Sequence, residues 1–217
     1  MLTVKQYVNN PYTSNTFILE EDNGADVYLI DAGFTCSIKE LIGSDKKIKG
    51  VFLTHAHYDH IHGINEVMKA FPDCGIYCSI DTKQGLYNEK LNLSFYHEEP
   101  ITLKSGMVTT FGNNDSVRLF ENCHLKILET PGHNSGSLSF IVSNYFFTGD
   151  SYIPNIPVVT KLKGGNKEAN LKSLELIYSS CYGDTILCPG HGPTFKGGAL
   201  EQAIVTDAKR YNIPFNI

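Results

Sequence analysis

The sequence predicts a layered α/β domain whose loops carry the chemistry at one edge of its sheets. Segments with strand and helix patterns are interspersed along the chain, and several apolar segments end in histidine or aspartate. A length of 217 residues suits one domain with a substantial core, and a composition of 41% hydrophobic and 19% charged residues is typical of a folded globular protein. We therefore expect a single domain over residues 1–217.

The first half of the chain predicts a hairpin, a further strand and a helix. NTFILEE and DVYLIDAG flank the turn signal DNG, a pattern that favours two paired strands. KKIKGVFLT ends in an apolar run, which predicts the next strand. Helical spacing then predicts a helix that ends before Pro72, on the apolar residues Ile61, Ile64, Val67, Met68 and Phe71. The stretch THAHYDHIHG between them is expected in a strand-to-helix loop.

The second half becomes readable after residues 80–122, where polar turns and short apolar pieces leave the boundaries open. HLKILE and TILCPG predict strands that lead into loops, and SLSFIVSNYFFTGDS predicts a hairpin that turns near Ser143 and Asn144. Two helices are expected from apolar residues that share one face, Leu171, Leu174, Ile177 and Cys181 in the first and Leu200, Ile204, Ala208 and Tyr211 in the second.

Charge and hydropathy argue against several classes of partner. The net charge is -5 and no Lys/Arg run is present, so we expect no nucleic-acid partner. The N-terminus lacks the pattern of a secretory signal, and no segment approaches the roughly 20 apolar residues that span a bilayer. We expect a cytoplasmic protein without disulfides, in which Cys74 and Cys78 of CGIYC are buried strand thiols rather than half of a metal site.

The segment THAHYDHIHG places four of the eight histidines within ten residues. His55 and His57 alternate on one side of the loop, and the next turn brings Asp59 and His60 toward them. Imidazole and carboxylate in this mixture suit zinc, iron or manganese. Solvated loop residues are the alternative, but later strand ends supply further ligands, His133 in TPGH, Asp150 in FTGD and His191 in PGHG. The sequence therefore predicts a metal centre.

These motifs resemble those of the metallo-β-lactamase superfamily, and within it the glyoxalase II-like hydrolases. SNTFILEEDNGADVYLIDAGF, VFLTHAHYDHIHG, LETPGHNSGSLSF, YFFTGD and CPGHGPTF match the family's motifs in order over nearly the whole chain. The resemblance implies a four-layer αββα sandwich that forms a single catalytic domain. It assigns His55, His57 and His133 to one metal, and Asp59, His60 and His191 to the other, with Asp150 bridging both. Glycines beside the ligands fit loops that turn sharply past the ions, although packing alone would also explain them.

The resemblance also implies a mechanism, in which two divalent cations hold a water molecule and lower its pKa from about 15.7 towards 7. Zn²⁺ is the expected metal, with iron or manganese as alternatives, because metals of similar affinity exchange on one ligand set. Asp59 is expected to be catalytic as well as a ligand, since its carboxylate would orient the nucleophile or move its proton.

Other polar residues are assigned by their position. Tyr152 and Lys161 follow Asp150 and are expected to bind substrate, with packing of the sheet edge as the alternative for Tyr152. His62 stands where many glyoxalase II-like sequences have glycine, and it is expected outside the ligand set, at the mouth of the pocket. Asp31 either supports the loops behind the metals or is a plain turn residue. His97 is a candidate for a substrate loop.

The resemblance favours hydrolysis of a small-molecule thioester, or of a related ester or lactone. The chain ends near the end of the catalytic domain, so the glutathione-binding extension of true glyoxalase II enzymes is not expected, and LKGGN departs from the family at Lys161 and Lys163. The alternative is a persulfide dioxygenase with a single iron. Nucleases and β-lactamases proper are disfavoured, because no nucleic-acid-binding arm and no cysteine ligand are evident. The sequence does not indicate the oligomeric state.

Overall fold

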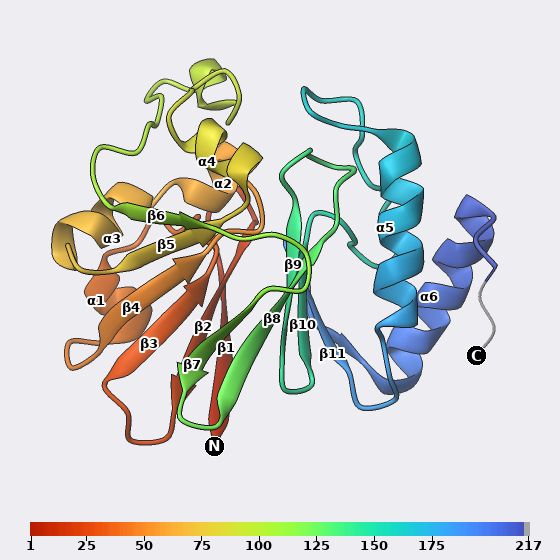
Figure 1. Ribbon diagram of the computed structural model, residues 1–217, viewed down its shortest axis with the longest axis horizontal. Coiled ribbons are helices and arrows are strands. Elements are labelled where there is room, and N and C mark those ends of the chain that lie inside the picture. The colour runs from red at the N-terminus through yellow and green to blue at the C-terminus, as the bar shows by residue number, and fades with distance from the viewer. Residues whose placement is uncertain (215–217) are drawn as a thin grey trace.

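The computed structural model describes residues 1–214 and has four layers, with two six-stranded sheets packed between outer layers of helices (Figure 1). This arrangement confirms the predicted αββα sandwich. The last three residues of the expected domain lie outside the described part of the chain.

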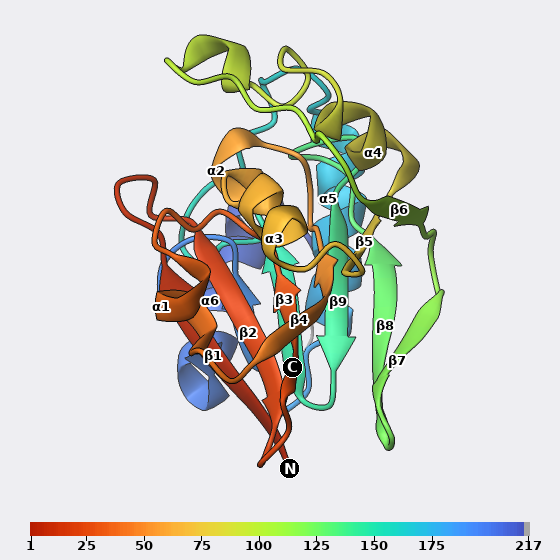
Figure 2. The same cartoon turned by 90° about the vertical axis from the view of Figure 1, so that its left-hand side faces the viewer.

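The first sheet has the order β1-β2-β3-β4-β5-β6 and occupies the half of the molecule drawn from red to yellow-green (Figures 1 and 2). Its strands are β1 (Leu2–Val8), β2 (Asn15–Glu21), β3 (Asp26–Ile30), β4 (Lys47–Phe52), β5 (Gly75–Cys78) and β6 (Met107–Thr110). The pair β2–β3 is antiparallel, which confirms the hairpin around DNG, and β3 to β6 run parallel. Cys74 and Cys78 are buried at the two ends of β5, as predicted.

The second sheet has the order β12-β11-β10-β9-β8-β7. Its strands are β7 (Ser116–Phe120), β8 (Cys123–Glu129), β9 (Leu138–Val142), β10 (Tyr145–Gly149), β11 (Ile186–Pro189) and β12 (Phe195–Lys196). The β9–β10 hairpin turns through Ser143 and Asn144, as predicted. Because β8 and β10 are both antiparallel to β9, and β11 is parallel to β10, the carboxyl ends of β8, β10 and β11 lie at one edge.

The helices cover the outer faces of the sheets (Figure 1). They are α1 (Ile38–Ile42), α2 (Tyr58–Ile61), α3 (Ile64–Ala70), α4 (Ile80–Leu86), the 3-10 helix η1 (Ser94–Tyr96), α5 (Lys167–Ser179) and α6 (Gly197–Tyr211). The first four lie on the side of the first sheet, and α5 and α6 cover the second sheet. The sequence predicted one helix after the histidines, and the structure has two, α2 and α3, separated by His62 and Gly63.

Three apolar clusters separate the four layers. Val67 and Met68 of α3 pack against the first sheet, whereas Phe52 and Phe140 lie between the two sheets, with ring centroids 5.8 Å apart. Ile177 of α5 belongs to the outer cluster on the second sheet. Burial of this apolar surface is the main stabilising contribution to such a sandwich.

The two sheets are joined at the edge where the histidine loop begins. The backbone N–H of Leu138 in β9 donates to the carbonyl of Thr54, at 2.8 Å, just after β4. Asn15 at the start of β2 donates through its side chain to the Pro189 carbonyl at 2.8 Å. These bonds join the first sheet to the second at this edge, because one connects the loop after β4 to β9 and the other connects β2 to the end of β11. Over residues 1–214, none of the helices is long and apolar enough to cross a membrane.

Candidate metal centre

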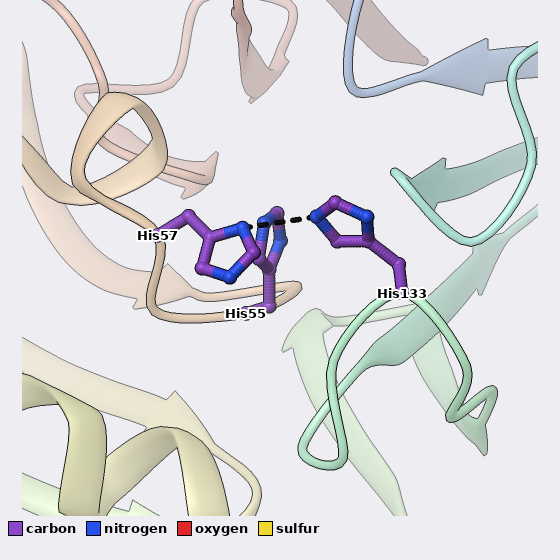
Figure 3. A group of neighbouring side chains, drawn as sticks. All are labelled: His55, His57 and His133. Atoms are coloured by element: carbon purple, nitrogen blue, oxygen red, sulfur yellow. Dashed lines mark hydrogen bonds between the residues drawn. The ribbon is translucent and has the colours of Figure 1, made fainter. Parts of the chain in front are cut away.

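Three histidines from two facing loops form the first cluster, which we define as His55, His57 and His133 (Figure 3). His55 and His57 leave the first sheet after β4, and His133 follows β8 in the second sheet. Their potential ligand atoms lie within 4.8 Å of one another, and all three side chains are buried. The His57 Nδ1 and His133 Nε2 atoms are hydrogen-bonded at 2.9 Å. The loop geometry therefore brings together the three residues that the sequence assigned to one metal.

The second cluster consists of Asp59, His60 and His191, whose ligand atoms also lie within 4.8 Å. Asp59 and His60 are in the short helix α2, and His191 follows β11. The Asp59 carboxylate lies 3.1 Å from His191 Nε2 and 3.6 Å from His60 Nε2. This cluster is less enclosed than the first, because the side chains of Asp59 and His191 are 27% and 23% exposed.

Asp150 lies between the two clusters, directly after β10. One carboxylate oxygen is 3.6 Å from Nε2 of His133 in the first cluster and 3.6 Å from Nε2 of His191 in the second. The other is 3.5 Å from His60 Nε2. Asp150 is therefore within 3.6 Å of histidines of both clusters, and all seven predicted ligands come together at one edge of the sandwich.

Glycines next to the ligands are required by backbone conformation and by close approach. Gly149 has φ +49°, in the left-handed region that favours glycine, directly before Asp150. A Cβ on Gly190 would lie 2.1 Å from Asp150 Oδ1, and one on Gly33 would lie 1.8 Å from the Asp59 carbonyl oxygen. The loops therefore pass too close to the ligands to carry larger side chains, which supports the backbone interpretation over ordinary packing.

Unpaired buried atoms show that the site fits a cation. Among the described residues, His55 Nε2, His60 Nε2 and Asp150 Oδ1 are buried without a hydrogen-bond partner. Each such atom costs about 1–3 kcal/mol if it stays unsatisfied. All three belong to one group whose ligand atoms converge within 4.8 Å. A metal ion accepts lone pairs from all of them, and the mixture of imidazole and carboxylate suits zinc, iron or manganese.

The two clusters have opposite electrostatic character. Burial and the neighbouring histidines lower the pKa of His57 to about 4, and they hold the pKa of His55 well below its usual value. Burial would also lower the pKa of His60, but the carboxylates of Asp59, Asp31 and Asp150 raise it to about 10. Burial would raise the pKa of Asp59, but His60 and His191 lower it well below its usual range. His55 and His57 of the first cluster are thus held as neutral imidazoles, whereas His60 of the second cluster is held as an imidazolium beside carboxylates.

Asp31 is hydrogen-bonded to His60 of the second cluster and to Thr54. Of its two predicted roles, support of the ligand loops therefore fits better than a plain turn residue. Its carboxylate accepts hydrogen bonds from the Thr54 backbone N–H at 2.7 Å and from the Thr54 hydroxyl at 2.8 Å. His60 Nδ1 lies 2.8 Å from the same carboxylate. A proton on Nδ1 leaves Nε2 free to bind a metal, and such carboxylate–histidine pairs orient ligands in many metal sites.

The two residues assigned to substrate binding do not lie at the centre. Tyr152 is 1% exposed, its hydroxyl donates to Asp207 at 3.2 Å, and its ring contacts Tyr178. The substrate role expected for Tyr152 is therefore wrong, because the chain turns after Asp150 and sends this side chain under α5 and α6. Lys161 is exposed and does not line the cavity at the metal cluster, whereas its neighbour Leu162 does. Direct contact of Lys161 with substrate is not supported.

A cavity of about 250 Å³ opens beside both clusters. It is lined by Tyr12, His57, Tyr58, Asp59, Leu93, His97, His133, Asp150 and Leu162. His97 is thus at the cavity, as expected for a residue of a substrate loop. His62 belongs to neither cluster and contacts the rings of Tyr12 and Tyr58 instead.

Sequence reasoning missed Tyr12 and Tyr58 as residues of the site. Tyr58 stands between two ligands in the motif HYDH, so its position was a usable signal. Tyr12 precedes the first predicted strand, and only the three-dimensional fold places it beside α2, where its ring centroid lies 5.2 Å from that of Tyr58.

Comparison with known proteins agrees with this geometry. The model of the metallo-beta-lactamase superfamily matches residues 9–191. YqgX of Bacillus subtilis, described as a probable metallo-hydrolase, is 30% identical over 184 residues, which are 78% of this chain and 85% of the relative. The hydroxyacylglutathione hydrolase of Salmonella typhi is 26% identical over 176 residues, which are 81% of this chain. The chain spans only 60% of the length of that relative.

Solved structures show the same architecture. The crystal structure of BLEG-1, a B3 metallo-beta-lactamase, aligns with a TM-score of 0.81 and 25% identity, and the match covers 95% of this chain and 97% of BLEG-1. ETHE1 from Myxococcus xanthus aligns with a TM-score of 0.67 and 19% identity over 97% of this chain and 83% of ETHE1, a likeness of fold alone. The matched family model covers the loops of all seven candidate ligands. The chain therefore belongs to the metallo-beta-lactamase superfamily of metallo-hydrolases.

Proposed function

We propose that this protein is a binuclear metal-dependent hydrolase that cleaves a small thioester or a related ester or lactone. The observation that carries the proposal is the pair of ligand clusters joined by Asp150, with unpaired buried atoms on His55, His60 and Asp150 itself. When bound, the divalent cations would supply a water of lowered pKa and would polarise the carbonyl group of the substrate. Zn²⁺ is the proposed metal, with iron or manganese as alternatives.

The residues of the chain have separate roles in this proposal. His55, His57 and His133 would hold one cation, and His60 and His191 would hold the other together with Asp59, while Asp150 would contact both. Asp59 also lines the cavity, and its lowered pKa keeps it ionised at neutral pH. Its ionised carboxylate can therefore accept a hydrogen bond from the attacking water and orient it. Asp59 is the proposed catalytic residue.

The position of His191 favours two metals over the single-iron alternative. A persulfide dioxygenase-like centre would need two histidines and one aspartate. Here His191 lies 3.1 Å from Asp59 and forms a second ligand group with Asp59 and His60, which a single-iron centre would not need. The relatives named hydroxyacylglutathione hydrolase support a thioester as the substrate class, but glutathione recognition does not follow, because the match covers 60% of their length. The cytoplasm is the proposed compartment, and the six free cysteines support it.

Metal analysis combined with a substrate panel tests this proposal. Elemental analysis of the purified protein should give close to two ions per chain, and the loaded protein should cleave a member of a thioester and lactone panel but not a phosphodiester. Failure to cleave any thioester or lactone at full metal content would rule out the proposed substrate class. Oxygen consumption with a persulfide and one iron per chain would establish the alternative.

The His57→Ala variant tests the ligand assignment. His57 is 4% exposed, and its imidazole points toward His133 (Figure 3). We expect the variant to lose metal from the first cluster and to lose turnover, while its circular dichroism spectrum stays that of the wild type. Exposed His124 in β8 provides the matched control, since His124→Ala should keep both properties. Full metal content in His57→Ala would contradict the assignment.

A further inference from the structure

Three rings form a continuous wall at the cavity beside the metal clusters. We define the aromatic wall as Tyr12, Tyr58 and His97. The rings of Tyr58 and His97 are stacked, with centroids 3.9 Å apart and an interplanar angle of 10°. Tyr12 meets both rings edge-on, at 5.2 Å and 89° for Tyr58 and at 5.7 Å and 87° for His97. Offset stacks and edge-on contacts of this kind are the favourable arrangements of aromatic rings.

The wall is assembled from three distant segments of the chain. Tyr12 lies in the loop before β2, Tyr58 opens α2 between the ligands His57 and Asp59, and His97 follows η1. The loop that carries His97 is tied to α2, because the Tyr58 backbone N–H donates to the Asn92 carbonyl at 2.8 Å. All three rings line the cavity that the metal ligands also line. A substrate whose reacting bond lies at the clusters therefore has its neighbouring group against the wall.

The rest of the cavity offers no positive side chain to an anionic substrate. None of the described residues that line it is lysine or arginine, and its charged groups, Asp59 and Asp150, belong to the metal clusters. Leu93 and Leu162 complete the lining. Moving a carboxylate or phosphate out of water to the part of the cavity beside the aromatic wall, away from the metal clusters and without a partner, is costly. The lining thus suits an uncharged apolar group.

We infer that the aromatic wall sets the substrate preference of this centre, which takes a neutral ester, thioester or lactone with an apolar, preferably aromatic, group next to the cleaved bond. The inference rests on the proposed hydrolytic function. It separates this chain from hydrolases that recognise the carboxylates of their substrates through lysine or arginine. His97 is the exposed residue of the wall, whereas Tyr58 is buried and Tyr12 half-buried, so His97 is the specificity-determining residue that substitution can test with least damage to the core.

The first experiment measures kcat and KM with the zinc-loaded chain on matched thioesters. In one series a neutral thiol is kept and the acyl group is acetyl, phenylacetyl or succinyl. In a second series the acyl group is acetyl and the thiol is ethanethiol, benzyl mercaptan or glutathione. We expect the phenyl-bearing member of at least one series to have a kcat/KM roughly 10-fold or more above that of its small neutral congener, because one well-filled apolar pocket discriminates by that factor. The succinyl and glutathione members should be the poorest.

Variants at His97 connect this preference to the wall. His97→Ala should reduce the advantage of the phenyl group to less than twofold, mainly through KM, whereas His97→Phe keeps a flat ring and should restore it. His124→Ala should behave as the wild type. The inference is overturned if a carboxylate-bearing substrate is the best of its series, or if the preference for phenyl survives in His97→Ala.

A binding measurement separates this inference from the proposed function. Benzyl alcohol is titrated into the zinc-loaded full chain, and the ring signals of histidine are followed by NMR. The expected result is a saturable shift of the His97 signal with an unshifted His124 signal, and succinate at the same concentration should shift neither. If this result is obtained but no thioester is cleaved, the hydrolytic function fails and the preference of the wall stands. If thioesters are cleaved with neither the shift nor the phenyl preference, the inference alone fails.

Discussion

Replacing Asp31 by asparagine would test whether the second cluster is a metal site in which the Asp31 carboxylate orients the ligand His60. Asp31 is 2% exposed and lies outside the ligand set, so the substitution removes no ligand. It has φ +60°, a conformation that asparagine tolerates better than most residues, so the backbone can keep its path. The side chains are nearly equal in size, and the change is confined to charge and hydrogen bonding.

The expected effect follows from the three hydrogen bonds of the carboxylate. Oδ1 accepts from the Thr54 backbone N–H at 2.7 Å, and Oδ2 lies 2.8 Å from both the Thr54 hydroxyl and His60 Nδ1. An amide has a single oxygen, and the Thr54 N–H will keep it, because a buried backbone donor without a partner costs about 1–3 kcal/mol. The NH₂ group then faces His60, whose Nδ1 must accept, so the proton moves to Nε2. A cation can then bind Nε2 only if the proton returns to Nδ1 against the NH₂ group, which lowers the affinity.

Substitution of a residue that orients a metal ligand reduces metal affinity by about 10–100-fold, which corresponds to about 1.4–2.7 kcal/mol. Zinc titration against a competing chelator should therefore show the loss for the second cluster alone. Asp207→Asn is the matched control, since Asp207 is a 1% exposed carboxylate that accepts hydrogen bonds remote from the centre. Two zinc ions bound by Asp31→Asn with affinities within threefold of the wild type would refute the reasoning.

Three further predictions follow from the centre and its surroundings. Carboxylates raise the pKa of His60 to about 10 and burial lowers that of His57 to about 4, so metal binding at neutral pH should release about one proton at the second cluster and none from His57. The affinity of the second cluster for its ion should therefore rise with pH up to about 10. Calorimetry in buffers of different ionisation enthalpy measures the proton release, and equal release from both clusters would contradict the prediction. Gly190→Ala should lose metal and about 1–3 kcal/mol of unfolding free energy, because its Cβ would lie 2.1 Å from Oδ1 of Asp150. Gly183→Ala is the control, since a Cβ there meets nothing within 4 Å. Denaturation and metal assays should show unchanged stability and metal content for this control. Tyr152→Phe should cost about 1 kcal/mol of stability and leave kcat/KM unchanged, because its hydroxyl is buried away from the cavity; a raised KM would restore its substrate role.

Four of the seven candidate ligands follow a recognisable strand within four residues, so their convergence was predictable from the sequence. His55, His133, Asp150 and His191 follow β4, β8, β10 and β11, and these strands have apolar cores that the pattern identifies. In a layered fold such strand ends converge at one edge. The chemistry of the centre could thus be predicted without knowing the orientation of any side chain.

The predicted substrate role of Tyr152 is wrong for a local physical reason. Spacing by two residues from Asp150 implies the same side only if the chain stays extended. Instead, Gly149 adopts φ +49° and the Ser151 N–H bonds to the Thr148 carbonyl at 3.1 Å, so the chain turns. Tyr152 then lies among the residues of the outer layer and reaches Asp207, which is 55 positions away. No pattern within the motif contains this information.

The middle of the chain was hard to predict because its elements are short or exposed. Helix α4 has 7 residues and η1 has 3, too few for helical periodicity to repeat. Strand β6 is an exposed edge strand of 4 residues, so it lacks a buried face that would give alternation. Yet this region supplies His97 and completes the cavity. The part of the site that we infer to set the substrate preference is therefore the part that sequence patterns describe least.

The two clusters differ in the charge of their ligands and in exposure, and this difference suggests separate roles for the two cations. The first cluster offers three buried imidazoles and no carboxylate of its own, so a cation there would keep most of its positive charge and could polarise a carbonyl group. The second cluster adds Asp59, and Asp31 behind His60, so a cation there is more neutralised and its site is more exposed. Asp59 is the ligand on that side that also lines the cavity, where an attacking water would need an acceptor for its proton. Electrophilic and basic functions would thus be divided between two clusters that share Asp150.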